Sequence, residues 1–149
     1  MILSEKIFFF LEGKWTLNRS TNGFGDMTGL ATFSLISKRN STFLYREDGI
    51  FTTSHQEKLL FYKEYIYCLN KGVIEVYFSS LQKKQDLLHT LTFSQNPDDC
   101  SAIGTHQCQH DLYKAIYTFV DMNTFILRYD VQGPKKKLII ETHFTRQKG

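Results

Sequence analysis

Apolar and polar residues alternate along most of this chain from Lys14 onward, and turn-forming residues interrupt the alternation about every 8 to 12 positions. Alternation of this kind places successive side chains on opposite faces of a β-strand. The clearest strands are predicted at residues 59–68, 73–78, 102–107, 111–119, 125–131 and 137–146. A turn is predicted at Asp48–Gly49. In total we expect about ten strands and no internal helix long enough to connect parallel strands.

Charged residues on the predicted interior faces favour a barrel over a sandwich. Arg19, Glu47, Lys63, His89 and Arg146 share strand faces with aromatic residues. A packed sandwich core disfavours so many charges, because burying an unpaired charge is costly. A barrel of this size can enclose one small ligand, for which a polar lining is useful. We therefore predict a mainly β fold, a single antiparallel up-and-down β-barrel with a short N-terminal helix.

The predicted helix lies before Gly13, with Ser4 as its N-cap. It contains three consecutive phenylalanines, Phe8, Phe9 and Phe10. One face of a helix cannot bury all three rings, so an exposed ring could form part of a protein-interaction surface. Alternatively, this helix closes one end of the barrel.

Length and composition indicate one soluble domain over residues 1–149. The net charge of +3 is small and evenly spread, so no nucleic-acid partner is predicted. The first apolar run is too short for a signal or membrane segment, and three cysteines suggest free thiols in a reducing compartment. We expect a cytoplasmic protein without a membrane partner, either a monomer or a weak homodimer.

The densest group of chemically active side chains is His106, Cys108, Asp111 and Tyr113. His106 and Cys108 share one strand face, but Asp111 and Tyr113 have the opposite parity, so a turn between them is needed for all four to meet. A histidine with a carboxylate partner can transfer a proton, and a tyrosine can stabilise an oxyanion. The same group could instead contact a ligand, or serve only to stabilise a turn.

No metal or cofactor is predicted. His106, Cys108 and His110 would line one face of a continuous strand and could ligate zinc or copper, but the expected strand break argues against this. Common phosphate-binding, zinc-protease and serine-hydrolase motifs are absent from the sequence. Their absence lowers the expectation of an enzyme.

Four further residues are candidates for ligand contacts. Arg19 and Lys136 could bind an anionic group, and Tyr45 and His89 would add hydrogen-bonding groups to an apolar lining. Together with the cluster above, the predicted ligand-binding residues are Arg19, Tyr45, His89, His106, Cys108, Asp111, Tyr113 and Lys136.

An ordered set of motifs resembles a known family across nearly the whole chain. The motifs are Gly13-x-Trp15, Gly29-x-Ala31-x-Phe33, Leu44-Tyr45-x-Glu47-x-Gly49, Tyr65-x-Tyr67, His106-x-Cys108-x-x-Asp111-x-Tyr113 and Val131-x-Gly133-Pro134-x-Lys136. They resemble the family called domain of unknown function 6314. The chain departs from the family pattern at Leu88 and Tyr129, where the family tends to have Phe and Trp. The resemblance implies a lipocalin-like (calycin-like) barrel in which Arg146 packs across Trp15.

The leading functional hypothesis is a barrel that binds an apolar or amphipathic small molecule, with an anionic ligand as one option. Two alternatives stay open at this point. One is a small isomerase, lyase or hydrolase that uses His106, Asp111 and Tyr113. The other is a protein-interaction barrel with a filled interior.

Overall fold

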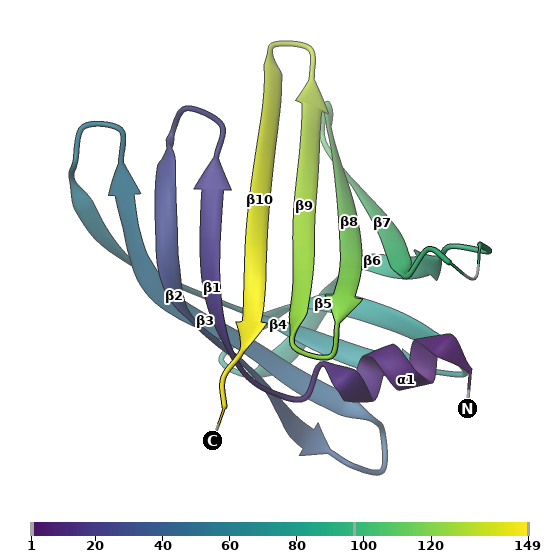
Figure 1. Ribbon diagram of the computed structural model, residues 1–149. Helices are drawn as coiled ribbons and strands as arrows, with labels where there is room; N and C mark the ends of the chain where they lie inside the picture. The colour runs from purple at the N-terminus through teal and green to yellow at the C-terminus, as the bar shows by residue number, and fades with distance from the viewer. Residues whose placement is uncertain (1, 97, 149) are drawn as a thin grey trace.

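The structure is a computed structural model that describes residues 2–96 and 98–148. One helix, α1 (Leu3–Phe10), precedes ten strands in these residues. The strands are β1 (Gly13–Thr21), β2 (Gly25–Ser37), β3 (Thr42–Thr53), β4 (Lys58–Asn70), β5 (Val73–Ser80), β6 (Lys83–Phe93), β7 (Ser101–Cys108), β8 (Asp111–Asp121), β9 (Thr124–Gly133) and β10 (Lys136–Arg146). Each strand pairs antiparallel with its neighbours in sequence, and β1 pairs with β10 to close a barrel (Figure 1). The predicted mainly β barrel is confirmed.

The turn predicted at Asp48–Gly49 is wrong, because β3 runs through it without a break. Gly49 lies opposite Gly29 of β2 in the strand register. A Cβ on Gly49 would lie 2.5 Å from the Thr28 carbonyl oxygen, so the two strands approach too closely here for a side chain. The glycine that suggested a turn therefore serves close packing of the barrel wall.

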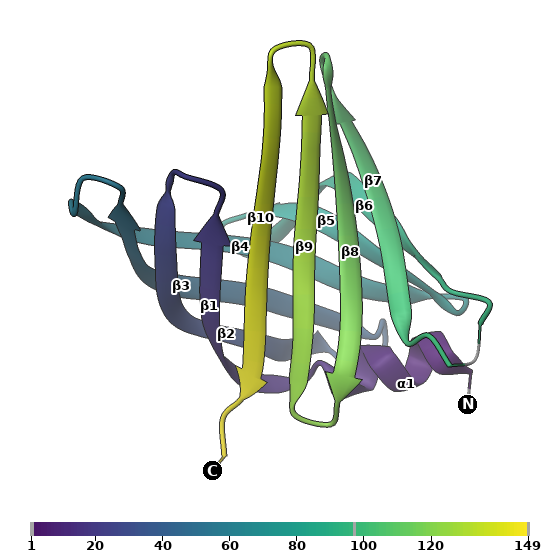
Figure 2. The same cartoon turned by 45° about the horizontal axis from the view of Figure 1, so that its top comes forward.

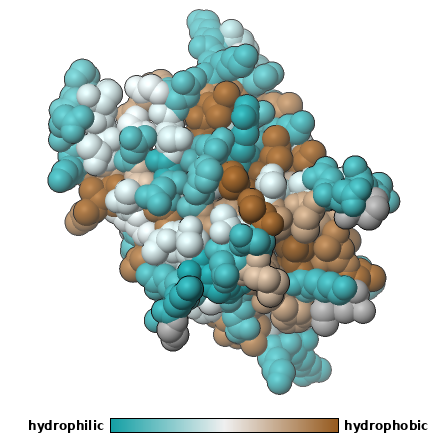
Figure 3. Space-filling view, viewed as in Figure 1, coloured by the Kyte–Doolittle hydropathy of each residue, from teal (hydrophilic) through white to brown (hydrophobic). Residues whose placement is uncertain are grey.

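Helix α1 closes one end of the barrel, as Figure 1 shows. The Phe8 ring is fully buried and stacks on Phe43, with ring centroids 4.5 Å apart. Phe10 packs edge-on against Trp15, whereas Phe9 remains 45% exposed. The helix thus buries one ring, half-buries a second and leaves the third outside, as the three consecutive phenylalanines require. Apolar surface is visible around this end of the molecule (Figure 3). This helix is not long and apolar enough to cross a membrane.

The N-cap predicted at Ser4 is wrong. The helix begins at Leu3, two residues earlier than that cap would require, and Ile2 at the cap position makes no side-chain capping bond. The Ser4 hydroxyl instead donates to the Gly72 carbonyl oxygen at 2.6 Å. A tertiary contact with the β4–β5 turn therefore takes the hydroxyl that a cap would use.

Arg146 connects the end of the chain to this closed end. Its guanidinium lies 4.3 Å from the centre of the Trp15 ring. It also donates to the carbonyl oxygens of Phe10 and Glu12, at 2.5 and 2.9 Å. The packing of Arg146 across Trp15 that the family resemblance implied is present in the structure.

The barrel wall is weakest between β6 and β7. Only Thr92–Ile103 and Phe93–Ala102 are paired between these strands in the residues described, whereas β7 pairs with β8 along its full length. A β-bulge in β6 places Leu88 as an extra residue between the pairs Val76–His89 and Tyr77–Leu87. We call the stretch where β6 and β7 are unpaired, from Lys83 to Leu91 on β6 and from Gly104 to Cys108 on β7, the seam.

Candidate functional site

Figure 2 shows the barrel with helix α1 at one end. The opposite, open end holds a cavity in three adjacent compartments that all border Lys63 and Tyr129. The first compartment has a volume of about 190 Å³ and is lined by Arg19, Thr21, Met27, Phe51, Phe61, Lys63, Tyr129, Ile140 and Thr142. The second, of about 280 Å³, is lined by Lys63, Tyr65, Phe78, Leu88, His106, Cys108, Tyr113, Tyr129 and Ile140. A small third compartment of about 20 Å³ lies over the filled half of the barrel.

A buried ion pair forms the floor of the first compartment. The Arg19 guanidinium donates to both Glu47 carboxylate oxygens, at 2.6 and 2.9 Å, and its Nε donates to the Thr142 hydroxyl at 2.7 Å. The Tyr45 hydroxyl donates to the same carboxylate at 2.6 Å. Burial opposes ionisation of Glu47, but the hydrogen bonds and charge of Arg19 outweigh it and lower the pKa of that carboxyl. The two charges neutralise each other at the floor.

Lys63 lies opposite Glu47 in the β3–β4 register, so two cations, Arg19 and Lys63, face one carboxylate and leave one positive charge in excess. Its side chain is half-buried, and no carboxylate lies within ion-pair distance of it in the described part of the chain. The ammonium nitrogen lies 5.5 Å from the centre of the Phe61 ring and 5.6 Å from that of Tyr65. The cavity therefore offers one cation beside aromatic walls.

The β7–β8 hairpin brings the predicted cluster together at the rim of the second compartment. Its turn is at Gln109–His110, and Gln109 adopts a positive φ of 55°. His106 is paired with Tyr113, and Cys108 with Asp111, across the hairpin. The turn that the opposite parities required is present, and three of these side chains line the cavity (His106, Cys108 and Tyr113).

Asp111 pairs with Lys136 rather than with His106. The Lys136 ammonium lies 3.4 Å from the Asp111 carboxylate and 5.7 Å from the centre of the Tyr113 ring. Residues 2–96 and 98–148 contain no hydrogen bond between His106 and Asp111. The histidine–carboxylate pair that the enzyme hypothesis needs is therefore not formed. Nor do the described residues contain a group of three or more potential metal ligands.

His89 lies in the barrel wall beside the seam rather than in the cavity lining. It is 3% exposed, and a Cβ added to Gly104 of β7 would lie 2.6 Å from its ring. Its Nε2 atom has no hydrogen-bond partner in the described structure. Burial, together with the nearby His106, lowers its pKa from 6.5 to about 4, so the ring is neutral near pH 7.

The predicted site residues thus occupy different depths. Arg19, His106, Cys108 and Tyr113 line the two larger compartments, and Tyr45 lies beneath them. Asp111 and Lys136 pair at the rim, and His89 belongs to the wall. In the second compartment, the lining residues that sequence reasoning did not select are Lys63, Phe78, Leu88, Tyr129 and Ile140. Alternation placed Lys63 and Tyr65 on an interior face, but alternation carries no information about depth along the barrel.

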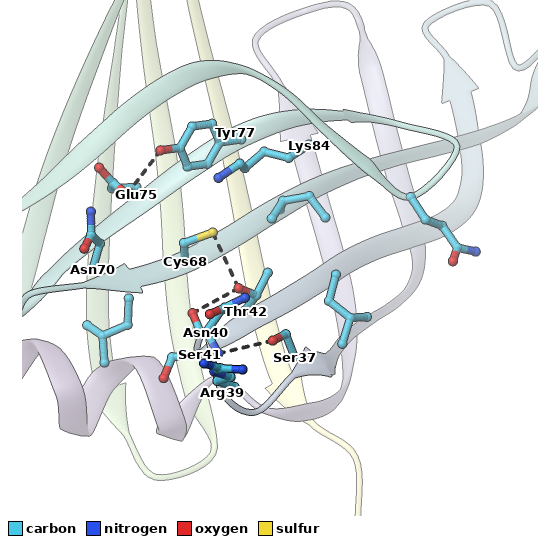
Figure 4. Close-up of a pocket in the computed structure, with 14 residues that line it drawn as sticks. Ser37, Arg39, Asn40, Ser41, Thr42, Cys68, Asn70, Glu75, Tyr77 and Lys84 are labelled. Carbon is cyan, nitrogen blue, oxygen red and sulfur yellow. Dashed lines mark hydrogen bonds between the residues drawn. The ribbon is translucent and has the colours of Figure 1, made fainter.

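A separate groove of about 610 Å³ lies outside the barrel, between the β2–β3 turn and the β5–β6 end, over the outward face of β4. Figure 4 shows its polar lining, in which the Tyr77 hydroxyl donates to Glu75 at 3.1 Å and Cys68 lies 3.8 Å from the Thr42 hydroxyl. None of the predicted site residues lines this groove. It is larger than the compartments inside the barrel, but the Tyr77–Glu75 bond already satisfies part of its polar lining.

Comparison with known proteins places the chain in a family. The model of a family of unknown function, DUF6314, matches residues 11–146. The chain belongs to this family. That match confirms the resemblance drawn from the ordered motifs, and the barrel fits the lipocalin-like architecture that it implied. No curated protein matches the family member described here.

Two solved structures share the barrel fold at low sequence identity. One is the S-type phycobiliprotein lyase CPES from Guillardia theta, with a TM-score of 0.69 and 10% identity over 97% of this chain and 93% of the lyase. The other is the barrel EF1p2_mFAP2b bound to DFHBI, with a TM-score of 0.52 and 11% identity over 98% of this chain and all of the other (100%). At such identities the likeness shows the fold alone.

Proposed function

We propose that this protein binds an amphipathic small molecule with a single anionic group in the open end of its barrel. The anionic group lies against Lys63, and the apolar part lies against the aromatic walls of the second compartment. Four of the residues predicted from sequence to contact the ligand line these compartments and would contact it: Arg19, His106, Cys108 and Tyr113.

The unpaired charge of Lys63 is the observation that carries this proposal. Arg19 is neutralised by Glu47 and Lys136 by Asp111, so Lys63 supplies the net charge at the centre of the cavity. An anionic partner stabilises a half-buried cation more than a fully hydrated cation, because water screens the half-buried charge less. One net positive charge favours a monoanion over a phosphate-like dianion.

The shape of the barrel supports a small-molecule ligand. One half of the barrel is packed around Trp15, Phe33 and Phe125, and the cavity lies in the half that Lys63 borders. Mostly apolar pockets with a few polar groups are typical of small-molecule sites. The solved barrel EF1p2_mFAP2b binds the small molecule DFHBI, which agrees with ligand binding in a barrel of this kind.

Fluorescence titration with 8-anilinonaphthalene-1-sulfonate, an amphipathic monoanion, tests the proposal. We expect this probe to bind, and Lys63→Met to weaken binding about tenfold, the effect of losing ~1.4 kcal/mol. Lys63→Arg keeps the charge and should retain most of the affinity. Lys114→Met, which removes an exposed cation from β8, is the matched control. Equal binding by the Lys63→Met and Lys114→Met variants would contradict the role of Lys63.

A further inference from the structure

The unpaired seam between β6 and β7 lies directly beside the ligand cavity. Leu88 of β6 and the His106 and Cys108 side chains of β7 line the second compartment from the two sides of the seam. The strands carry no register pairs there in the described residues, since their two pairs lie further along, at Thr92 and Phe93. Side chains alone, without a hydrogen-bonded ladder, separate this compartment from solvent.

We propose that the seam is a lateral exit from the cavity and that the natural ligand is an elongated monoanion whose apolar end projects through it. The inference rests on the proposed function and specifies its ligand class. The anionic head lies at Lys63, and the apolar body extends along Phe78 and Leu88 toward Cys108. A compact anion would fill only the space around Lys63.

The polarity of the two compartments sets this direction. The first compartment contains the charged and hydroxyl groups of Arg19, Thr21 and Thr142. The second, toward the seam, is lined largely by aromatic and aliphatic side chains. An amphipathic chain gains most when its head lies in the first and its apolar part in the second, because each part then keeps a matching environment.

Local packing keeps the two strands of the seam unpaired. The His89 ring lies against Gly104, and the Leu88 bulge turns two consecutive side chains inward. Regular pairing of β7 with this part of β6 would have to remove the bulge. The unpaired stretch therefore results from the packing of His89 and the bulge at Leu88.

The composition of the β6 edge favours a ligand over an added β-strand. Lys83, Lys84 and Asp86 lie along its unpaired part and are exposed. Charged side chains on an edge strand discourage pairing with another chain. A chain-like small molecule makes apolar contacts and does not need the unpaired backbone N–H and C=O groups of the β6 edge.

The native thiols supply the test. Cys108 is exposed and lies at the proposed exit, whereas Cys100 is partly buried and does not line the cavity. The rate of alkylation of each thiol by N-ethylmaleimide is measured by peptide mass mapping, with saturating hexanoate or dodecanoate. Both carboxylates should displace the anilinonaphthalene sulfonate probe. Dodecanoate should suppress most alkylation of Cys108 and leave Cys100 unchanged, whereas hexanoate should protect neither.

A bulky variant at the exit gives a second readout. Cys108→Trp should weaken dodecanoate binding much more than hexanoate binding, and Lys114→Trp, on the outward face of β8, should alter neither. If both carboxylates displace the probe with equal affinity and Cys108 stays reactive, the lateral exit is wrong and the proposed function stands. If neither carboxylate nor the probe binds, both proposals fall.

Discussion

At the scale of single residues, the buried Arg19–Glu47 pair should be costly to break from one side, because a lone buried charge is left behind. Arg19→Met would leave the Glu47 carboxylate, which is 1% exposed, without its charged partner. Removing one partner of such a pair costs about 3 kcal/mol of unfolding free energy. Urea unfolding measures this loss. The control is Arg46→Met, because Arg46 pairs with Asp48 at 2.9 Å on the exposed surface, where water screens the pair, and its loss should be much smaller. Similar losses for the two variants would show that the buried pair is not special.

His89 predicts a pH dependence of stability in mild acid. Its pKa of about 4 in the folded protein lies below the ordinary value of 6.5, so the unfolded chain binds its proton more readily. Stability should therefore fall as the pH drops from 6.5 to 4, by about 3 kcal/mol in total for this group. Urea unfolding as a function of pH should show this fall, and His89→Leu should flatten it. His55→Leu, at an exposed histidine, should leave the fall unchanged.

At the scale of elements, the contact between β6 and β7 at the seam depends on the missing side chain of Gly104. A Cβ there would lie 2.6 and 2.7 Å from two atoms of the His89 ring. Gly104→Ala should destabilise the protein by about 1–3 kcal/mol, the usual cost of overpacking. The cost should largely disappear in a His89→Ala background, and a double-mutant cycle measures that coupling. Additive costs would mean that the two residues do not oppose each other.

The sequence predicted strands well because alternation is a local property, but it could not predict where the ladder departs from regularity. The bulge at Leu88 depends on pairing with β5, and the continuity of β3 through Gly49 depends on Gly29 in another strand. The candidate site was predicted in part for the same reason. Alternation placed Arg19 and Lys63 on interior faces, and both line the cavity, whereas the depth that separates His89 from Lys63 arises only from the barrel.

At the scale of the whole molecule, Arg146 joins the end of the last strand to the helix that closes the barrel. Arg146→Met would remove the donors to the Phe10 and Glu12 carbonyl oxygens. Helix α1 should then exchange its amide hydrogens faster, because short helices owe their stability to tertiary contacts. Hydrogen exchange with mass spectrometry measures the change. Arg128→Met, which breaks only the Arg128–Asp130 pair, should leave α1 protected.

The seam also changes how the sheet itself is ordered. β1 and β10 are joined by seven register pairs from Trp15–Arg146 to Thr21–Ile140, far more than hold β6 to β7. If the barrel is treated as an open sheet with its edges at the seam, β6 and β7 are the two edge strands. β1 and β10 are then neighbours in the centre of the sheet. The centre of this sheet therefore forms only when β1 and β10, which are far apart in the sequence, pair with each other. Such distant contacts make folding slow, and β1–β10 docking would limit its rate.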